Sequence, residues 1–225
     1  MDATPAYLTP SEQVYLNGEK FAPKAGVFGK TRLMHVEFDA NVIQLVQAVF
    51  AAALLTLEQQ GTLRLEIRPK KVLFGLASTK GLYADVLGPM AAWPVQTIEA
   101  ALPGLATQLA ANKGQNEVYS MVYAWLGQDY AAPFEEVLLR VKHGLAARGL
   151  MEAREERTLK IFTRTVFVLP EATRRLALDQ SIQPLQQLLG WCQQTRPDVW
   201  ESLNNQIKKA VAAHQEKSDT DFDSD

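Results

Sequence analysis

The sequence predicts a mainly α-helical protein, a single helical domain with two helix–glycine–β-hairpin units of winged-helix-like form. Two observations predict this fold class. Apolar side chains recur at helical spacing over most of the 225 residues. At Gly61, and again at Gly149, the apolar period changes from that of a helix to that of a strand. Residues 1–214 form the expected domain, and the acidic segment 215–225 is expected to be a disordered tail.

The first helix is expected to begin at Thr9-Pro10-Ser11-Glu12. Thr9 can cap the helix, Pro10 suits its first turn, and Glu12 can complete a capping box by reaching back to the Thr9 amide. The segment 21–32 that follows contains proline and glycines, and it predicts a loop.

The most apolar stretch of the chain predicts a long helix from about Ala40 to Gln60. Asp39 is its expected N-cap, and Gly61 is expected to end it. The apolar run inside it contains two glutamines and is shorter than the roughly 20 residues that cross a bilayer. We therefore expect a buried core helix and not a transmembrane segment.

The first hairpin is expected directly after Gly61, where residues 63–67 alternate between apolar and polar. A turn is expected at Arg68-Pro69-Lys70-Lys71, with the second strand at Val72 to Leu76. From Tyr83 to Tyr130, prolines and glycines predict several short helices.

The second unit begins with an apolar helical stripe that runs from Pro133 to Gly149. A hairpin follows, with expected strands at Leu150 to Arg154 and Leu159 to Leu169 and a turn near Glu155-Glu156-Arg157. Further helices are expected after Pro170.

Catalytic chemistry has no recognisable sequence signature in this chain. His35, His143 and His214 lie far apart and lack the spacing of metal ligands. Cys192 lies in an apolar helical pattern and is expected to be a buried small hydrophobe. We therefore expect no enzymatic activity, no catalytic residue, no metal and no cofactor.

Composition indicates a cytoplasmic protein. The single cysteine cannot form an internal disulfide, which fits a reducing compartment. The first ten residues lack the basic and apolar regions of a signal peptide. The net charge of −2 gives no overall attraction to nucleic acid or to an anionic membrane, so any such attraction requires a local patch.

Basic residues concentrate on the two predicted hairpins, and they are the candidate residues for binding an anionic surface. They are Arg64, Arg68, Lys70, Lys71, Arg154, Arg157, Lys160 and Arg164. Two interpretations are open. In the first, the residues belong to a solvated surface of mixed charge. Alternatively, they form a basic face that meets anionic lipid head groups or a nucleic-acid backbone.

Several segments, in order, resemble the Golgi phosphoprotein 3 family of peripheral membrane adaptors. Members open with a helix of the form LT-x-x-E-x-x-x-L, and Leu8 to Leu16 has this form. Leu54 to Glu66 is similar to the family's apolar helix that ends in glycine and a strand. Val141 to Pro170 is similar to its later helix, glycine and long hairpin. The resemblance covers about Leu8 to Leu189.

The resemblance implies a peripheral adaptor, and eukaryotic members hold phosphatidylinositol 4-phosphate with a tryptophan and arginines. Counted without gaps from Gly61 and Gly149, those places fall on Asn41, Phe50, Glu135 and Leu138, none of which is cationic. We therefore expect a divergent member that does not select this lipid.

The expected function is that of a non-enzymatic binding protein. It would associate peripherally with anionic lipid head groups, with a protein partner, or with a second copy of itself through the hairpins. The alternative is a winged-helix nucleic-acid-binding regulator, against which the net charge of −2 argues.

Overall fold

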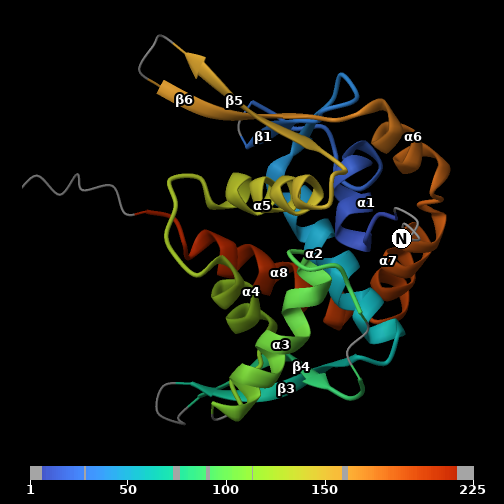
Figure 1. Ribbon diagram of the computed structural model, residues 1–225. Helices are drawn as coiled ribbons and strands as arrows, with labels where there is room; N and C mark the ends of the chain where they lie inside the picture. Colours follow the sequence, from blue (N-terminus) through green and yellow to red (C-terminus); the bar gives the residue numbers. More distant parts are fainter. Residues whose placement is uncertain are drawn as a thin grey trace, which may run out of the picture.

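Helix α2 (Val42–Gln59) lies at the centre of the fold, and most other elements pack around it (Figure 1). The computed structural model describes residues 7–27, 29–72, 77–89, 92–112, 114–158 and 162–216. The other helices are α1 (Pro10–Leu16), α3 (Ile98–Ala111), α4 (Val118–Leu126), α5 (Pro133–Ala147), α6 (Glu171–Asp179), α7 (Gln183–Thr195) and α8 (Pro197–Ala212), with a 3-10 turn at Gly18–Lys20.

The strands form three antiparallel pairs. They are β1 (Lys30–Arg32) with β2 (Asp39–Asn41), β3 (Leu63–Val72) with β4 (Ala77–Val86), and β5 (Glu152–Thr158) with β6 (Phe162–Val168). Each pair is a separate two-stranded sheet.

The prediction of a buried core helix is confirmed for α2. Helices α1, α3, α5, α7 and α8 and strand β3 contact it, and its residues from Ala48 to Leu57 are all buried. Within the part of the chain that the structure describes, α2 is the one helix long and apolar enough to cross a membrane, yet two thirds of it is covered by the fold. The predicted cap was wrong: Asn41, not Asp39, caps α2 by accepting a hydrogen bond from the Gln44 amide at 3.1 Å.

The predicted fold class was wrong. The described residues form eight α-helices and three small two-stranded sheets, so the structure is mixed α/β and not mainly α with winged-helix-like units. One cause is the β1–β2 ribbon, part of which falls in the expected loop of residues 21–32. Its strands are short and polar, so they carry no alternating apolar pattern. Backbone pairing across the connection of residues 33–38, such as Thr31 with Ala40, creates them instead.

The second cause is that both predicted hairpins contain more strand than expected. They do follow Gly61 and Gly149, which adopt the left-handed φ values of +72° and +70° suited to glycine after a helix. However, the expected turns at Arg68–Lys71 and Glu155–Arg157 are strand. These segments of β3 and β5 extend beyond the helical body, where polar residues suit either face of a ribbon.

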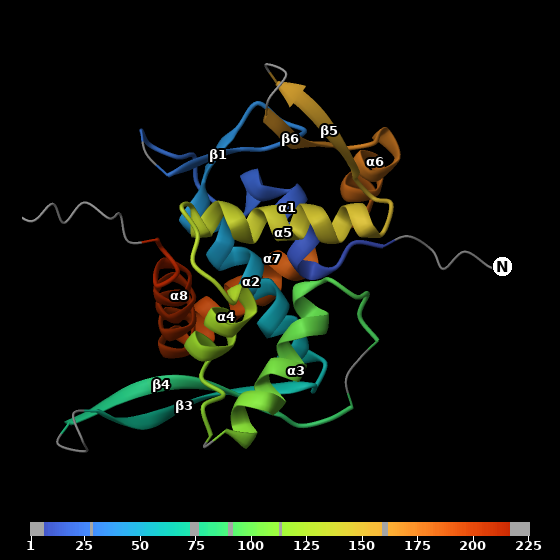
Figure 2. The ribbon, with the colours of Figure 1, turned by 60° about the vertical axis from the view of Figure 1, so that its left-hand side comes forward.

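The two hairpins lie at opposite ends of the molecule. Figures 1 and 2 both place β3–β4 beside α3 at one end and β5–β6 beside β1 and α6 at the other. The helical body, with α2 at its centre, separates them. This arrangement gives the molecule two separate protruding ribbons and does not join the ribbons into one face.

The end of the chain is also partly described. Gln215 and Glu216, which the sequence assigns to a disordered tail, hydrogen-bond with Ala131 and Tyr130. Residues 217–225 lie outside the described part of the chain.

Candidate functional site

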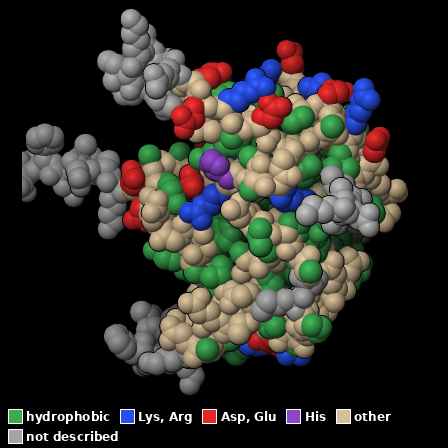
Figure 3. Space-filling model, viewed as in Figure 1, with side chains coloured by type: hydrophobic (Ala, Val, Ile, Leu, Met, Phe, Trp, Pro, Cys, Tyr) green, Lys and Arg blue, Asp and Glu red, His purple; other side chains and the backbone are tan. Residues whose placement is uncertain are grey.

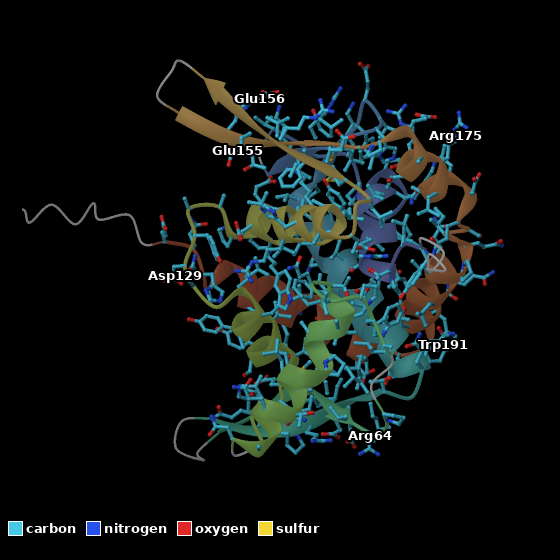
Figure 4. The ribbon with its side chains drawn as sticks, in the orientation of Figure 1. Arg64, Asp129, Glu155, Glu156, Arg175 and Trp191 are labelled. Atoms are coloured by element: carbon cyan, nitrogen blue, oxygen red, sulfur yellow. The ribbon has the colours of Figure 1, made fainter. Side chains whose placement is uncertain are left out.

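The candidate cations do not share one surface, because they are divided between the two hairpins. Arg64, Arg68 and Lys70 lie on β3, whereas Arg154 and Arg164 lie on β5 and β6. In Figure 4, Arg64 lies at the opposite end of the molecule from Glu155 and Glu156 of β5. The side chains of Lys71 and Arg157, and the whole of Lys160, lie outside the described residues.

The described cations of β3 are paired with carboxylates. Arg68 hydrogen-bonds to Asp85 on β4 and to Glu66 at 2.9 Å, and Arg64 lies 3.4 Å from Asp85. Lys70 pairs with Glu117, which precedes α4. Burial acts to raise the pKa of Asp85, but hydrogen bonds from Arg68 and neighbouring groups outweigh it, and the pKa is lowered. The lowered pKa favours the charged form of Asp85, which offsets part of the positive charge of this ribbon.

The β5–β6 ribbon has the same pattern of matched charge. Arg154 pairs with Glu152 on the same strand, and Arg164 lies 3.6 Å from Glu156 across the pair of strands. In Figure 3, acidic and basic side chains are interspersed at this end of the molecule. The geometry therefore favours the first interpretation of these residues, a mixed-charge surface. Such exposed pairs give little net attraction to an anionic layer.

The residues 152–156 of β5 are all exposed, so both faces of the strand meet solvent. No backbone hydrogen bond from another described segment reaches β5 or β6. We call this ribbon, Glu152–Thr158 with Phe162–Val168, the β5–β6 arm. Its base is anchored, where Phe167 packs edge-on against His143 at 5.0 Å between ring centres.

The four positions that the resemblance would place in a phosphoinositide pocket have structural roles here. Phe50 and Leu138 are buried in the core, and Phe50 packs edge-on against Trp125. Asn41 is engaged as the cap of α2, and Glu135 accepts a hydrogen bond from Thr31 at 3.3 Å. An anionic head group would meet a carboxylate at this place.

The buried ionisable groups hold α1 in position. Fully buried Glu99 of α3 accepts hydrogen bonds from the backbone amide and the hydroxyl of Ser11. Burial raises the pKa of Glu99 to about 7, partly opposed by these hydrogen bonds. Glu12 beside it accepts hydrogen bonds from the Thr9 amide at 2.8 Å and from Arg148 at 2.5 Å. Sequence analysis missed Glu99, although a glutamate beside the apolar positions of a helix was a possible signal.

His214, His35 and Cys192 are also enclosed by the fold. His214 is buried, with Nε2 2.8 Å from the Tyr123 carbonyl and Nδ1 3.2 Å from Asp129. His35 is largely buried, and this burial lowers its pKa. Cys192 is fully buried, which confirms the prediction for that residue. Among the described residues, no group of three His, Cys, Asp or Glu side chains could hold a metal ion.

A cleft of about 710 Å³ separates the start of α3 from α5, and Trp125, Arg140 and His143 line it. Arg140 is already committed there, because it donates to the last carbonyls of α4, at Trp125 (2.6 Å) and Leu126 (2.7 Å). It acts as a cap for α4 and is not a free anion-binding group.

Comparisons of the chain with protein-family models, with curated proteins and with solved structures gave no match. The functional assignment therefore depends on geometry and on the resemblance of the sequence motifs.

Proposed function

We propose that the protein is a non-catalytic adaptor that docks a protein partner through the β5–β6 arm. One observation carries the proposal: residues 152–156 are exposed on both faces of β5, and the arm pairs with no other described strand. An isolated two-stranded ribbon is at best marginally stable in water. A partner that adds a strand or covers one face would complete its hydrogen bonding and packing.

The charges of the arm suit a protein surface better than a lipid surface. Glu152, Arg154 and Glu156 alternate in sign along one face of β5. A partner with the complementary order would gain specificity and register from such a pattern. A uniformly anionic membrane would be attracted by the arginine and repelled by the glutamates.

The motif resemblance to the Golgi phosphoprotein 3 family supports the adaptor part of this proposal. The opening LT-x-x-E segment, Gly61 and Gly149 occupy defined structural places: the start of α1 and the ends of α2 and α5. The two ribbons at opposite ends of the body would allow two partners to be held at once (Figure 2).

Site-specific photo-crosslinking in the native host tests the proposal. A photoreactive residue at Glu155 is expected to give a discrete adduct, whereas one at exposed Gln108 on α3 is the control. The double variant Glu152→Arg/Arg154→Glu keeps an ion pair in the arm but inverts its charge order, and it should lose the adduct. An adduct of twice the chain's mass would identify a second copy as the partner. Equal labelling at both positions, or none at Glu155, would contradict the proposal.

A further inference from the structure

A groove of about 660 Å³ lies where helices α2, α7 and α8 meet, with residues from 20 to 23 also in its lining. Its lining is unusual because six side chains carry carboxamides. They are Gln44 and Gln47 on α2, Gln186 and Gln193 on α7, and Asn204 and Asn205 on α8. We call it the carboxamide groove. Its volume falls within the range of about 300–1,000 Å³ that is typical of small-molecule sites.

Two of the six carboxamides form a fixed part of the wall. The Gln47 side chain donates to the Asn204 carbonyl at 2.9 Å, and the Asn204 side chain donates to the Trp200 carbonyl at 2.8 Å. These bonds orient both amides before any ligand arrives and leave their side-chain oxygens as acceptors.

The other four carboxamides are uncommitted. Within the described residues, the side chains of Gln44, Gln186, Gln193 and Asn205 make no hydrogen bond to the protein. Each of these amides has one acceptor and two donor hydrogens. They come from three different helices and converge on one volume.

A glycine and two aromatic side chains also line the groove. Gly190 lies one turn from both Gln186 and Gln193, and a Cβ atom there would meet nothing within 4 Å, so the glycine keeps the floor open. The aromatic side chains of Phe21 and Trp200 also line the groove. They supply flat apolar surface beside the amides.

The groove has little net charge of its own. Its charged lining residues are Lys20 and Glu201, which have opposite signs. Phosphate recognition would instead require clustered arginines or a helix N-terminus. The ligand that fits this lining is neutral and hydrogen-bonds in several directions.

We propose that the carboxamide groove binds a neutral saccharide, either free or as the terminal unit of a glycoconjugate. Each sugar hydroxyl both donates and accepts, as the free carboxamides do, and the hydroxyls surround the ring on several sides. The apolar C–H face of the ring would lie against Phe21 or Trp200. An extended peptide fits less well, because its polar groups form a row, whereas the free amides here belong to three different helices around the groove.

Ligand-observed saturation-transfer NMR tests this inference on the full chain. The probes are neutral hexoses, N-acetylhexosamines and their disaccharides at millimolar concentration. At least one is expected to receive saturation. The variants Gln186→Ala and Gln193→Ala should each raise the Kd of the bound sugar by at least about threefold, as expected for the loss of one or two hydrogen bonds.

The matched controls are Gln187→Ala and Gln194→Ala, which change exposed glutamines on the same helix outside the groove. They should leave the Kd unchanged, and circular dichroism should show that all four variants keep the fold. A glycan array separates the two sources: binding only to immobilised conjugates assigns a glycoconjugate, and equal affinity for the free sugar assigns a free saccharide.

Three results would overturn the inference. The first is saturation of none of the sugars by the folded protein. The second is binding that the double variant Gln186→Ala/Gln193→Ala does not weaken. The third concerns a neutral peptide from a random library. Such a peptide would overturn the inference if it binds the groove, binds the same double variant more weakly, and is not displaced by saccharides.

Discussion

The carboxylate of Glu99 on α3 accepts two hydrogen bonds from Ser11 at the start of α1, from the backbone amide at 2.7 Å and from the hydroxyl at 2.9 Å. The two residues are 88 positions apart in the chain. A side chain of one helix therefore satisfies an amide that the first turn of another helix leaves unpaired. Because Glu99 is fully buried, this contact also makes the protein sensitive to pH.

Stability should decrease as the pH rises through neutrality. Burial raises the pKa of Glu99 from its ordinary 4.5 to about 7, so the native state holds this proton more tightly than the unfolded state. The resulting contribution, on the order of 3 kcal/mol, is complete below pH 4.5 and is lost as the pH rises to above 7. Urea unfolding at pH 5 and pH 8 measures it. The Glu99→Gln variant cannot titrate, so parallel pH curves for the two proteins would contradict the prediction.

Arg148 should matter far more to stability than Arg154. The ion pair of Arg148 with Glu12 is buried, with 15% and 2% of the two side chains exposed, whereas Arg154 and Glu152 are 63% and 49% exposed. Removal of Arg148 leaves a buried carboxylate uncompensated, so Arg148→Ala should lower the free energy of unfolding by about 3–5 kcal/mol. Arg154→Ala should lower it by less than about 1 kcal/mol. Equal losses in chemical denaturation would show that the buried pair has no special role.

Phe50→Ala should destabilise the protein by roughly 3–5 kcal/mol, because the residue is fully buried in α2 and leaves a cavity beside Trp125. The midpoint of thermal unfolding measures the loss. Phe21→Ala, at a half-buried position, is the control and should cost less. An unchanged midpoint for Phe50→Ala would mean that the core can refill this space.

Any membrane association should be electrostatic, weak and unselective among anionic lipids. Each basic residue near an anionic surface contributes about 1 kcal/mol, but Arg64, Arg68 and Arg154 are already paired with carboxylates. Co-sedimentation with phosphatidylserine vesicles should therefore vanish as salt is added. Deletion of the acidic residues 218–225 should strengthen it slightly. Tight, salt-resistant binding to one phosphoinositide at equal surface charge would contradict this prediction.

Sequence patterns located the elements that depend on local periodicity. The apolar stripe of α2 and the changes of period at Gly61 and Gly149 depend on neighbouring residues, so helix and hairpins could be predicted there. The β1–β2 ribbon could not, because its strands are short and polar and are defined by their backbone pairing and not by an alternating composition. Missing it, and underestimating both hairpins, made the predicted fold class wrong.

The pairing of the candidate cations with carboxylates could not be predicted either. A basic run in the sequence looks like an unbalanced patch until the fold brings carboxylates to it. Arg68 meets Asp85 across the β3–β4 pair, and Lys70 meets Glu117 from beyond α3. The carboxamide groove was equally hidden, since glutamine and asparagine are ordinary on exposed helix faces and only the packing of three helices gathers them.

The central place of α2 has a consequence for the synthesis of the protein. Helices α3, α5, α7 and α8 cover α2, and all of them follow it in the chain. Until they emerge from the ribosome, α1 is the one described helix that can cover α2, which is long and apolar enough to enter a bilayer. The later helices therefore cover the apolar surface of α2 only after they have been synthesised. A chain that ends before α7 should be captured by membranes or aggregate, even though it keeps both ribbons.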